Sequence, residues 1–363
     1  MNPLSDMIAT LIANQGPLAI SDYMALALGH PQHGYYMKQV PLGEKGDFTT
    51  APEISQMFGE LIGIWCADTW QRMGAPAEIA LVELGPGRGT LMEDILRTLK
   101  VVPELLEAAE VHFVETSPAL TAEQRARVPQ ATWHASIESL PEKPVLLIAN
   151  EFFDALPIRQ FQRTEQGWHE RCLGLVPQEN GGWDFALQLA PDPIPNTALL
   201  PLNVLDAPPG SVAETCPAAQ SIAETLGAHL KRHGGAGLII DYGHGESAPG
   251  DTLQAVRAHD YANPFADPGE ADLTAHVDFA ALAQCFAKGG AKIWPLTTQS
   301  AFLSMLGIIQ RAKKLQASAT PAQSRDIKAA LHRLTDPGEM GTLFKVLTIT
   351  APDMAPPAGF DRA

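Results

Sequence analysis

The residues best suited to chemistry lie in the loop ELGPGRGT (residues 83–90), between a predicted strand and a predicted helix. Glycine permits sharp backbone turns and lets a ligand approach main-chain atoms closely. A dinucleotide fingerprint needs glycine at position 90, where threonine stands, and a P-loop needs Gly-Lys-Ser/Thr, which the loop lacks. An acidic residue two positions before G-x-G-x-G is typical of S-adenosylmethionine (SAM) sites, and a simple tight turn is the alternative. The candidate cofactor-binding residues here are Glu83, Gly85, Gly87 and Gly89.

A second acidic residue, Glu115, closes the next predicted strand, VHFVE (111–115). Rossmann-type sheets present a carboxylate at this position to the ribose hydroxyls of the cofactor. We therefore expect Glu115 to bind ribose, with a solvated strand-end acid as the alternative. Residues 134–137 follow the third predicted strand, and their position alone places them near the adenine.

The segment NEFFDALP (150–157) follows the fourth predicted strand, where ligands bind in open parallel sheets. Glu151 and Asp154 flank Phe152 and Phe153. This pattern suits a guanidinium group, because carboxylates bind it bidentately and aromatic rings stack on it. Since arginine stays protonated at neutral pH, the two acids would draw its charge onto one nitrogen and leave the other aligned for in-line attack on a methyl group. Alternatively, Glu151 binds only the ammonium group of the cofactor and Asp154 caps the next turn.

Apolar strands alternate with helices through most of the chain, which is typical of a parallel sheet covered on both faces. The predicted strands are 79–84, 111–115, 131–133, 144–150, 236–243, 291–297 and 343–350. The predicted helices between them begin at Thr90, at Ser117-Pro118, and near residues 217 and 277.

The flanking segments differ from this core. Helices are predicted at 4–15, in a segment that Ser21 caps and that stops before Pro31, and at 52–73 with a capping box formed by Thr50 and Glu53. Hairpin strands and a proline-rich loop at 157–215 indicate an insertion. The expected domain map is an N-terminal helical extension and lid (1–78), a first half of the core (79–156), an inserted α+β subdomain (157–215), a second half of the core (216–350) with a helical excursion (300–335), and a tail (351–363).

Composition excludes several classes of protein. The 363 residues are 45% apolar, which is enough for a core, and their formal charge of −16 disfavours unaided binding to nucleic acid. No apolar run approaches the roughly 18 residues of a membrane span. The cysteines and the pair His30 and His33 lack the spacing or the third ligand of a metal site, so no metal is expected. Without a visible signal or transit peptide, a cytoplasmic bacterial protein is the simplest expectation.

Several longer segments together resemble the MidA family, the bacterial and mitochondrial relatives of a respiratory complex I assembly factor. The matching segments are HPQHGYY (30–36), GDFTTAPEISQMFGE (46–60), ELGPGRGTL (83–91), NEFFDALPIRQF (150–161), IIDYGH (239–244) and DLTAHVDF (272–279). The resemblance implies a class I SAM-dependent methyltransferase fold, Rossmann-like with a mostly parallel seven-stranded sheet. It also implies protein-arginine methyltransferase activity, which in mitochondria acts on a core subunit of complex I.

Carried over by position, the resemblance adds further site residues. Asn150 and Glu151 would line the methyl-transfer site, so the candidate catalytic residues are Asn150, Glu151 and Asp154. A lid over the cofactor would come from Asp47, Phe48 and Thr49, for which a capped helix start is the alternative. The candidate substrate contacts are Phe152, Phe153, Asp241, Tyr242 and His276. A lone histidine such as His276 is more often structural than a base.

The leading hypothesis is therefore SAM-dependent methyl transfer to an arginine of a protein acceptor, such as a complex I subunit or its assembly intermediate. Two alternatives are a SAM-binding assembly factor without catalysis and a small-molecule methyltransferase. A homodimer is a further candidate assembly. No nucleic acid partner and no membrane span are expected.

Overall fold

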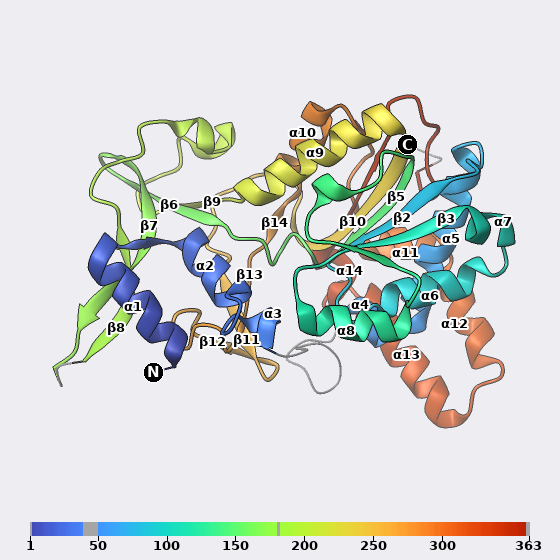
Figure 1. Ribbon diagram of the computed structural model, residues 1–363, viewed down its shortest axis with the longest axis horizontal. Coiled ribbons are helices and arrows are strands. Elements are labelled where there is room, and N and C mark those ends of the chain that lie inside the picture. Colours follow the sequence, from blue (N-terminus) through green and yellow to red (C-terminus); the bar gives the residue numbers. More distant parts are fainter. Residues whose placement is uncertain (1, 39–49, 180–181, 361–363) are drawn as a thin grey trace. The chain divides into compact units, whose positions relative to one another are not determined.

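The computed structural model describes residues 2–38, 50–179 and 182–360, which form two compact units (Figure 1). The first unit comprises Met1–Phe48, Asp154–Ser221 and Glu246–Ala281. The second comprises Thr49–Phe153, Ile222–Gly245 and Leu282–Ala363. The expected insertion at 157–215 thus falls within the first unit, together with two segments distant from it in sequence. The finer domain map stays a prediction.

The second unit is built on a large sheet that confirms the predicted fold class. The path of the sheet runs β15 (Lys292–Ile293), β17 (Phe344–Thr350), β10 (Gly235–His244), β5 (Val145–Asn150), β2 (Ile79–Leu84), β3 (Ala109–Val114) and β4 (Thr132–His134). The strands from β10 to β4 are parallel, whereas β17 runs antiparallel to both of its neighbours. Among the described residues the sheet has nine strands, and the seven on this path form the mostly parallel arrangement of a class I methyltransferase.

The single strand predicted at 291–297 is wrong. The structure has two short strands, β15 and β16 (Thr297–Thr298), which both pair with β17. Pro295 lies between them and has no N–H to donate to a ladder, so a continuous strand is interrupted there.

Burial explains why the central strands read as continuous apolar runs. Every residue of β2 and β5 is buried. In Figure 1, α5 (Gln56–Arg72), α6 (Thr90–Leu99) and α8 (Pro118–Arg127) cover one face of the sheet, and α9 (Pro217–His233) and α10 (Phe279–Gly289) cover the other. The parallel strands therefore have no solvated face.

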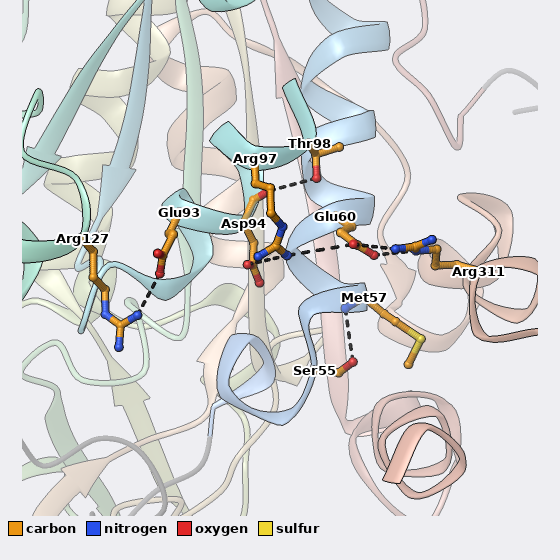
Figure 2. Close-up of polar contacts among 9 residues, drawn as sticks. All are labelled: Ser55, Met57, Glu60, Glu93, Asp94, Arg97, Thr98, Arg127 and Arg311. Atoms are coloured by element: carbon orange, nitrogen blue, oxygen red, sulfur yellow. Dashed lines mark hydrogen bonds and ion pairs between the residues drawn. The ribbon is translucent and has the colours of Figure 1, made fainter. Parts of the chain in front are cut away.

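Helices α5 and α6 pack closely because glycines of α5 face α6. A Cβ on Gly59 would lie 2.5 Å from the Cβ of Asp94, and one on Gly63 would lie 2.9 Å from the Cβ of Thr98. Figure 2 shows the polar contacts of this region, with Glu60 of α5 bound by Arg311 of α12 (Ile308–Gln316) through bonds of 2.6 and 2.7 Å. The glycine-rich loop thus leads into a helix that packs against α5, and α5 is in turn bound by α12.

The predicted helix 52–73 is broken in the structure. It forms α4 (Ala51–Ile54) and α5, separated by Ser55 in an extended conformation. The Ser55 hydroxyl accepts a hydrogen bond from the Met57 N–H (3.2 Å), so Ser55 is the cap of the long helix. The capping box of Thr50 and Glu53 is wrong, because the Thr50 side chain makes no capping bond and Glu53 binds elsewhere.

The first unit contains two small sheets. One has the order β1 (Leu18–Ala19), β7 (Gly167–Pro177), β6 (Arg159–Thr164) and β9 (Val212–Thr215), with β8 (Trp183–Leu189) paired to β7. The other has the order β12 (Asp260–Ala262), β11 (Gln254–Arg257) and β13 (Asp272–Thr274). These strands confirm the hairpin predicted within 157–215.

Helices α1 (Pro3–Gln15), α2 (Ile20–Gly29) and α3 (Tyr35–Lys38) complete the first unit. The cap predicted at Ser21 is wrong. Ala19, the last residue of β1, directly precedes α2 and still pairs with Cys172 of β7, so the chain passes directly from strand to helix.

The remaining elements are α7 (Pro103–Ala108), β14 (Val277–Asp278), α11 (Gln299–Met305), α13 (Pro321–Thr335), α14 (Met340–Leu343) and the 3-10 turns Ile137–Ser139, Thr197–Leu199 and Leu202–Val204. Helices α11 to α13 confirm the helical excursion predicted at 300–335. Within the described ranges, no helix is long and apolar enough to cross a membrane.

Candidate functional site

The loop between β2 and α6 has a backbone that requires glycine. Gly85, Gly87 and Gly89 have φ angles of 58°, 52° and 81°, in the left-handed region that other residues rarely adopt. A Cβ on Gly85 would also lie 2.8 Å from Cδ2 of Phe152. The loop therefore brings its main chain close to the end of β5, where Phe152 lies.

The same loop is anchored by Glu53, a residue whose role sequence reasoning missed. Thr90 donates its hydroxyl proton to Glu53 Oε1 (2.6 Å), and the Arg88 guanidinium lies 3.5 Å from Oε2. Glu53 comes from α4, which precedes α5. A sequence pattern does not reveal this contact, because the spacing of Thr50 and Glu53 also fits a helix cap.

Glu83 lies on β2 just before the loop and is 3% exposed. Among the described residues, its Oε2 has no hydrogen-bond partner. Burial raises the pKa of this carboxyl to about 8. A buried carboxylate oxygen without a partner is costly, so this position fits a ligand that brings its own hydrogen-bond donor or positive charge.

Glu115 directly follows β3, and hydrogen bonds to both of its carboxylate oxygens fix the orientation of its side chain. Its Oε1 accepts hydrogen bonds from the backbone N–H groups of Thr116 (2.8 Å) and Ser117 (2.7 Å). Its Oε2 accepts one from the side-chain amide of Gln124 (3.0 Å). Burial raises the pKa of this carboxyl, while these donors act to lower it. The predicted ribose-binding residue is thus preorganised beside the glycine loop.

The neighbouring strand β4 ends at His134, where the adenine was expected. The His134 carbonyl accepts the Glu115 N–H (2.9 Å), and its Nε2 lies 3.0 Å from Nδ1 of His112. Burial lowers the pKa of both histidines. The expected position of the adenine remains a prediction.

The turn after β5 carries a strained acidic residue. Glu151 has a φ of 50°, although it is not glycine. Its Oε1 accepts hydrogen bonds from the Ala51 N–H (3.1 Å) and from the side-chain amide of Asn150 (3.1 Å). Non-glycine residues in this region store strain of about 1–3 kcal/mol and concentrate at functional sites. The side chain of Glu151 is therefore held at a defined place beyond the sheet.

Asp241 explains how this turn is maintained. The residue is fully buried, and its Oδ2 accepts the backbone N–H groups of Phe152 (3.2 Å) and Phe153 (3.0 Å). Its Oδ1 accepts the N–H of Tyr242 (2.9 Å). The structure thus gives Asp241 contacts with the backbone, and a contact with the substrate stays a prediction.

The other expected substrate residues of the second unit lie partly in its interior. Phe153 is buried and packs edge-on against Phe152, with ring centroids 5.1 Å apart. Tyr242 is buried against Phe344, with ring centroids 5.4 Å apart. Of these residues, Phe152 is the one that retains partial exposure and contacts the glycine loop.

Two further candidates belong to the first unit. The Asp154 carbonyl accepts the Ala275 N–H (3.0 Å), and the His276 N–H donates to the hydroxyl of Thr252 (2.9 Å). Since Asp154 and Glu151 belong to different units, their action as a pair remains a prediction. Asp47, Phe48 and Thr49, the expected lid, lie outside the described residues. No cluster of three or more metal-ligating side chains occurs in the part of the chain that the structure describes.

Sequence comparison agrees with this geometry. Residues 61–295 match a family described as S-adenosyl-L-methionine-dependent methyltransferases. The chain is 36% identical to the protein arginine methyltransferase NDUFAF7 of Xenopus tropicalis mitochondria, over 99% of this chain and 90% of that one. It is 35% identical to the human mitochondrial protein of the same name, over 96% of this chain and 84% of the relative.

A solved structure is similar over nearly the whole chain. It is a COG1565 superfamily member from Burkholderia thailandensis bound to S-adenosyl-homocysteine (SAH), with a TM-score of 0.83 and 28% identity. The similarity covers 99% of this chain and 95% of that one. A protein of this architecture therefore binds the demethylated form of SAM.

Proposed function

Since this chain belongs to the MidA family of S-adenosyl-L-methionine-dependent methyltransferases, we propose that it methylates an arginine side chain of a protein. Two relatives at 35% and 36% identity carry the name protein arginine methyltransferase and align with almost the entire chain. The assignment to arginine also draws on the acidic turn after β5. A guanidinium cation fits a fixed carboxylate next to an aromatic ring.

The residues of the second unit suit the cofactor. Oε2 of Glu83, which has no hydrogen-bond partner among the described residues, would receive a donor from the cofactor. The glycine loop would contact the cofactor through its main-chain atoms, and Glu115 would accept hydrogen bonds from the cofactor's hydroxyl groups. SAM supplies an electrophilic methyl group bound to a positively charged sulfur. These assignments to individual residues are part of the proposal.

The single observation that carries the catalytic assignment is the conformation of Glu151. Its left-handed backbone and its bonds to Ala51 and Asn150 fix one carboxylate at the end of β5. Phe152, the next residue, contacts Gly85 of the loop. Glu151 would bind the guanidinium N–H groups and orient one nitrogen toward the methyl donor, so that catalysis comes from positioning and electrostatics.

The test uses methyl-labelled SAM and an extract of cells that lack the protein. We expect wild type to label a protein band whose hydrolysate contains methylarginine. Glu151→Gln, shown by calorimetry to bind SAH, should leave that band unlabelled. The matched control is Glu224→Gln, which removes a charge paired with exposed Lys288 on the surface and should label like wild type.

Other results would overturn the proposal in different ways. Label confined to low-mass products would indicate a small-molecule methyltransferase. Absence of label despite SAH binding would indicate an assembly factor that holds the cofactor without catalysis. Labelling by Glu151→Gln at the wild-type rate would remove Glu151 from the mechanism.

The acceptor and the setting complete the proposal. The family resemblance places a respiratory complex I subunit, or its assembly intermediate, first among the acceptors to test. Action in the bacterial cytoplasm and formation of a homodimer are further proposals, whereas the two named relatives are mitochondrial. Mapping the labelled arginine by mass spectrometry would identify the acceptor directly.

A further inference from the structure

One buried side chain, Gln124 of α8, contacts three parts of the candidate cofactor site. It is fully buried, and its Oε1 accepts the indole N–H of Trp133 (2.8 Å). Because an indole N–H can only donate, this bond determines which end of the amide is oxygen. The NH2 end of Gln124 must therefore face the opposite way, toward the glycine loop and Glu115.

Both hydrogens of that NH2 group have acceptors at the site. Nε2 donates to the carbonyl of Gly87 (2.7 Å) and to Oε2 of Glu115 (3.0 Å). The Gly87 carbonyl belongs to the glycine loop, and Glu115 belongs to the end of the adjacent strand. One amide thus sets the spacing between the two segments that the cofactor would contact.

The bonds to Glu115 also select the state of its carboxyl group. The backbone N–H groups of Thr116 and Ser117 and the amide of Gln124 can only donate to it. They therefore favour an ionised carboxylate, against the effect of burial. An ionised carboxylate is the better acceptor for hydroxyl groups.

We propose that Gln124 is a positioning residue for cofactor binding, which holds the Glu115 carboxylate and the Gly87 carbonyl in the arrangement that binds SAM. This inference rests on the cofactor site of the proposed function and does not depend on the acceptor. Gln124 acts through Glu115 and the loop. Its loss therefore weakens cofactor affinity and leaves the chemical step unchanged.

The chain offers two matched controls. Gln299 is equally buried and donates to a backbone carbonyl, that of Leu334 (3.0 Å). Arg127 lies on the same helix as Gln124 and forms an ion pair with Glu93 of α6 (2.8 Å), as Figure 2 shows. Gln299→Met tests the loss of a buried amide, and Arg127→Met tests the loss of a different side-chain contact of α8, the one with α6.

The first experiment measures SAH affinity by calorimetry for wild type, Gln124→Met and the two controls. Gln124→Met loses all three hydrogen bonds of the amide, and the two that its NH2 group donates, one of them to a charged group, link the loop to Glu115. We therefore expect its Kd to rise at least about tenfold. Both controls should stay within about twofold of wild type. In the labelling assay, KM for SAM should rise in Gln124→Met, with kcat unchanged at saturation.

A swapped pair of residues provides the rescue. Gln124→Glu alone places a carboxylate against Glu115 and should bind SAH more weakly than Gln124→Met. In the double variant with Glu115→Gln, the amide at position 115 can donate to the carboxylate at position 124. The combined loss of affinity should therefore be smaller than the product of the two single losses.

Two results would overturn the inference. If Gln124→Met bound SAH like wild type while its thermal stability fell as in Gln299→Met, Gln124 would serve packing alone. If the losses of the swapped pair multiplied without coupling, Gln124 would not act through Glu115. If wild type and the variants bind SAH as expected but wild type methylates no arginine, the proposed acceptor is refuted and this inference still stands.

Discussion

Removing the buried carboxyl of Glu83 should change how the stability of the protein depends on pH. Burial raises the pKa of this group from its ordinary value of 4.5 to about 8. Between these values the folded protein keeps a proton that the unfolded chain releases. The stability of wild type therefore falls as pH rises through that window. Glu83→Gln keeps the size of the side chain and removes the titration.

The size of the effect follows from the pKa difference. From pH 4.5 to pH 7 the unfolded carboxyl ionises over 2.5 pH units while the folded one stays mostly protonated. At about 1.4 kcal/mol per unit, this lowers the free energy of unfolding by about 3 kcal/mol. The stability of Glu83→Gln relative to wild type should rise by about this amount over the same range.

Urea unfolding at a series of pH values from 5 to 8 measures this difference directly. Glu224→Gln, which alters a surface ion pair, serves as the control and should follow wild type. If the curves of wild type and Glu83→Gln stay parallel across the range, Glu83 is ionised in the folded protein and the reasoning from burial is wrong. If the ammonium group of SAH binds Glu83, it favours the ionised carboxylate. Binding of SAH at pH 7 should then release a proton in wild type and none in Glu83→Gln.

Two further variants test the loop. Gly85→Ala combines backbone strain with a Cβ that approaches Phe152, so its Kd for SAH, measured by calorimetry, should rise at least about tenfold. Gly74 also has a positive φ but has open space around it, so Gly74→Ala should bind SAH like wild type. Equal effects of the two substitutions would exclude the contact with Phe152 as the cause. Glu53→Ala frees the hydroxyl of Thr90 and should weaken SAH binding by about tenfold. An unchanged affinity would show that Glu53 does not anchor the loop.

Local patterns were sufficient for most elements and for the glycine loop. The strands β2 and β5 are short apolar runs that are buried throughout, and β3 is buried over its last four residues, so a sequence pattern can identify all three. The positive φ angles in the loop explain why its glycines stand where they do. Ser117 caps α8 as its position before Pro118 predicts, because a cap involves only neighbouring residues.

The prediction for Glu53 failed because two partners competed for one side chain. Glu53 has the spacing of a capping box, yet it binds Thr90, which lies 37 residues further along the chain. The spacing of Thr50 and Glu53 cannot reveal that the fold brings the Thr90 hydroxyl to the Glu53 carboxylate. Ser55 then caps α5, because the chain extends there before the helix begins.

Contiguous patterns are enough to predict the class of protein, because the strand–loop–helix with its glycines, the strand-end acid Glu115 and the acidic turn at Glu151 each lie within a short segment. The groups that hold these segments in place become visible in the folded chain. Gln124 reaches Gly87 across 37 residues, and Asp241 captures the amide of Phe152 across 89. Such bonds depend on how separate strands and helices approach one another, and that approach follows from packing of the core as a whole.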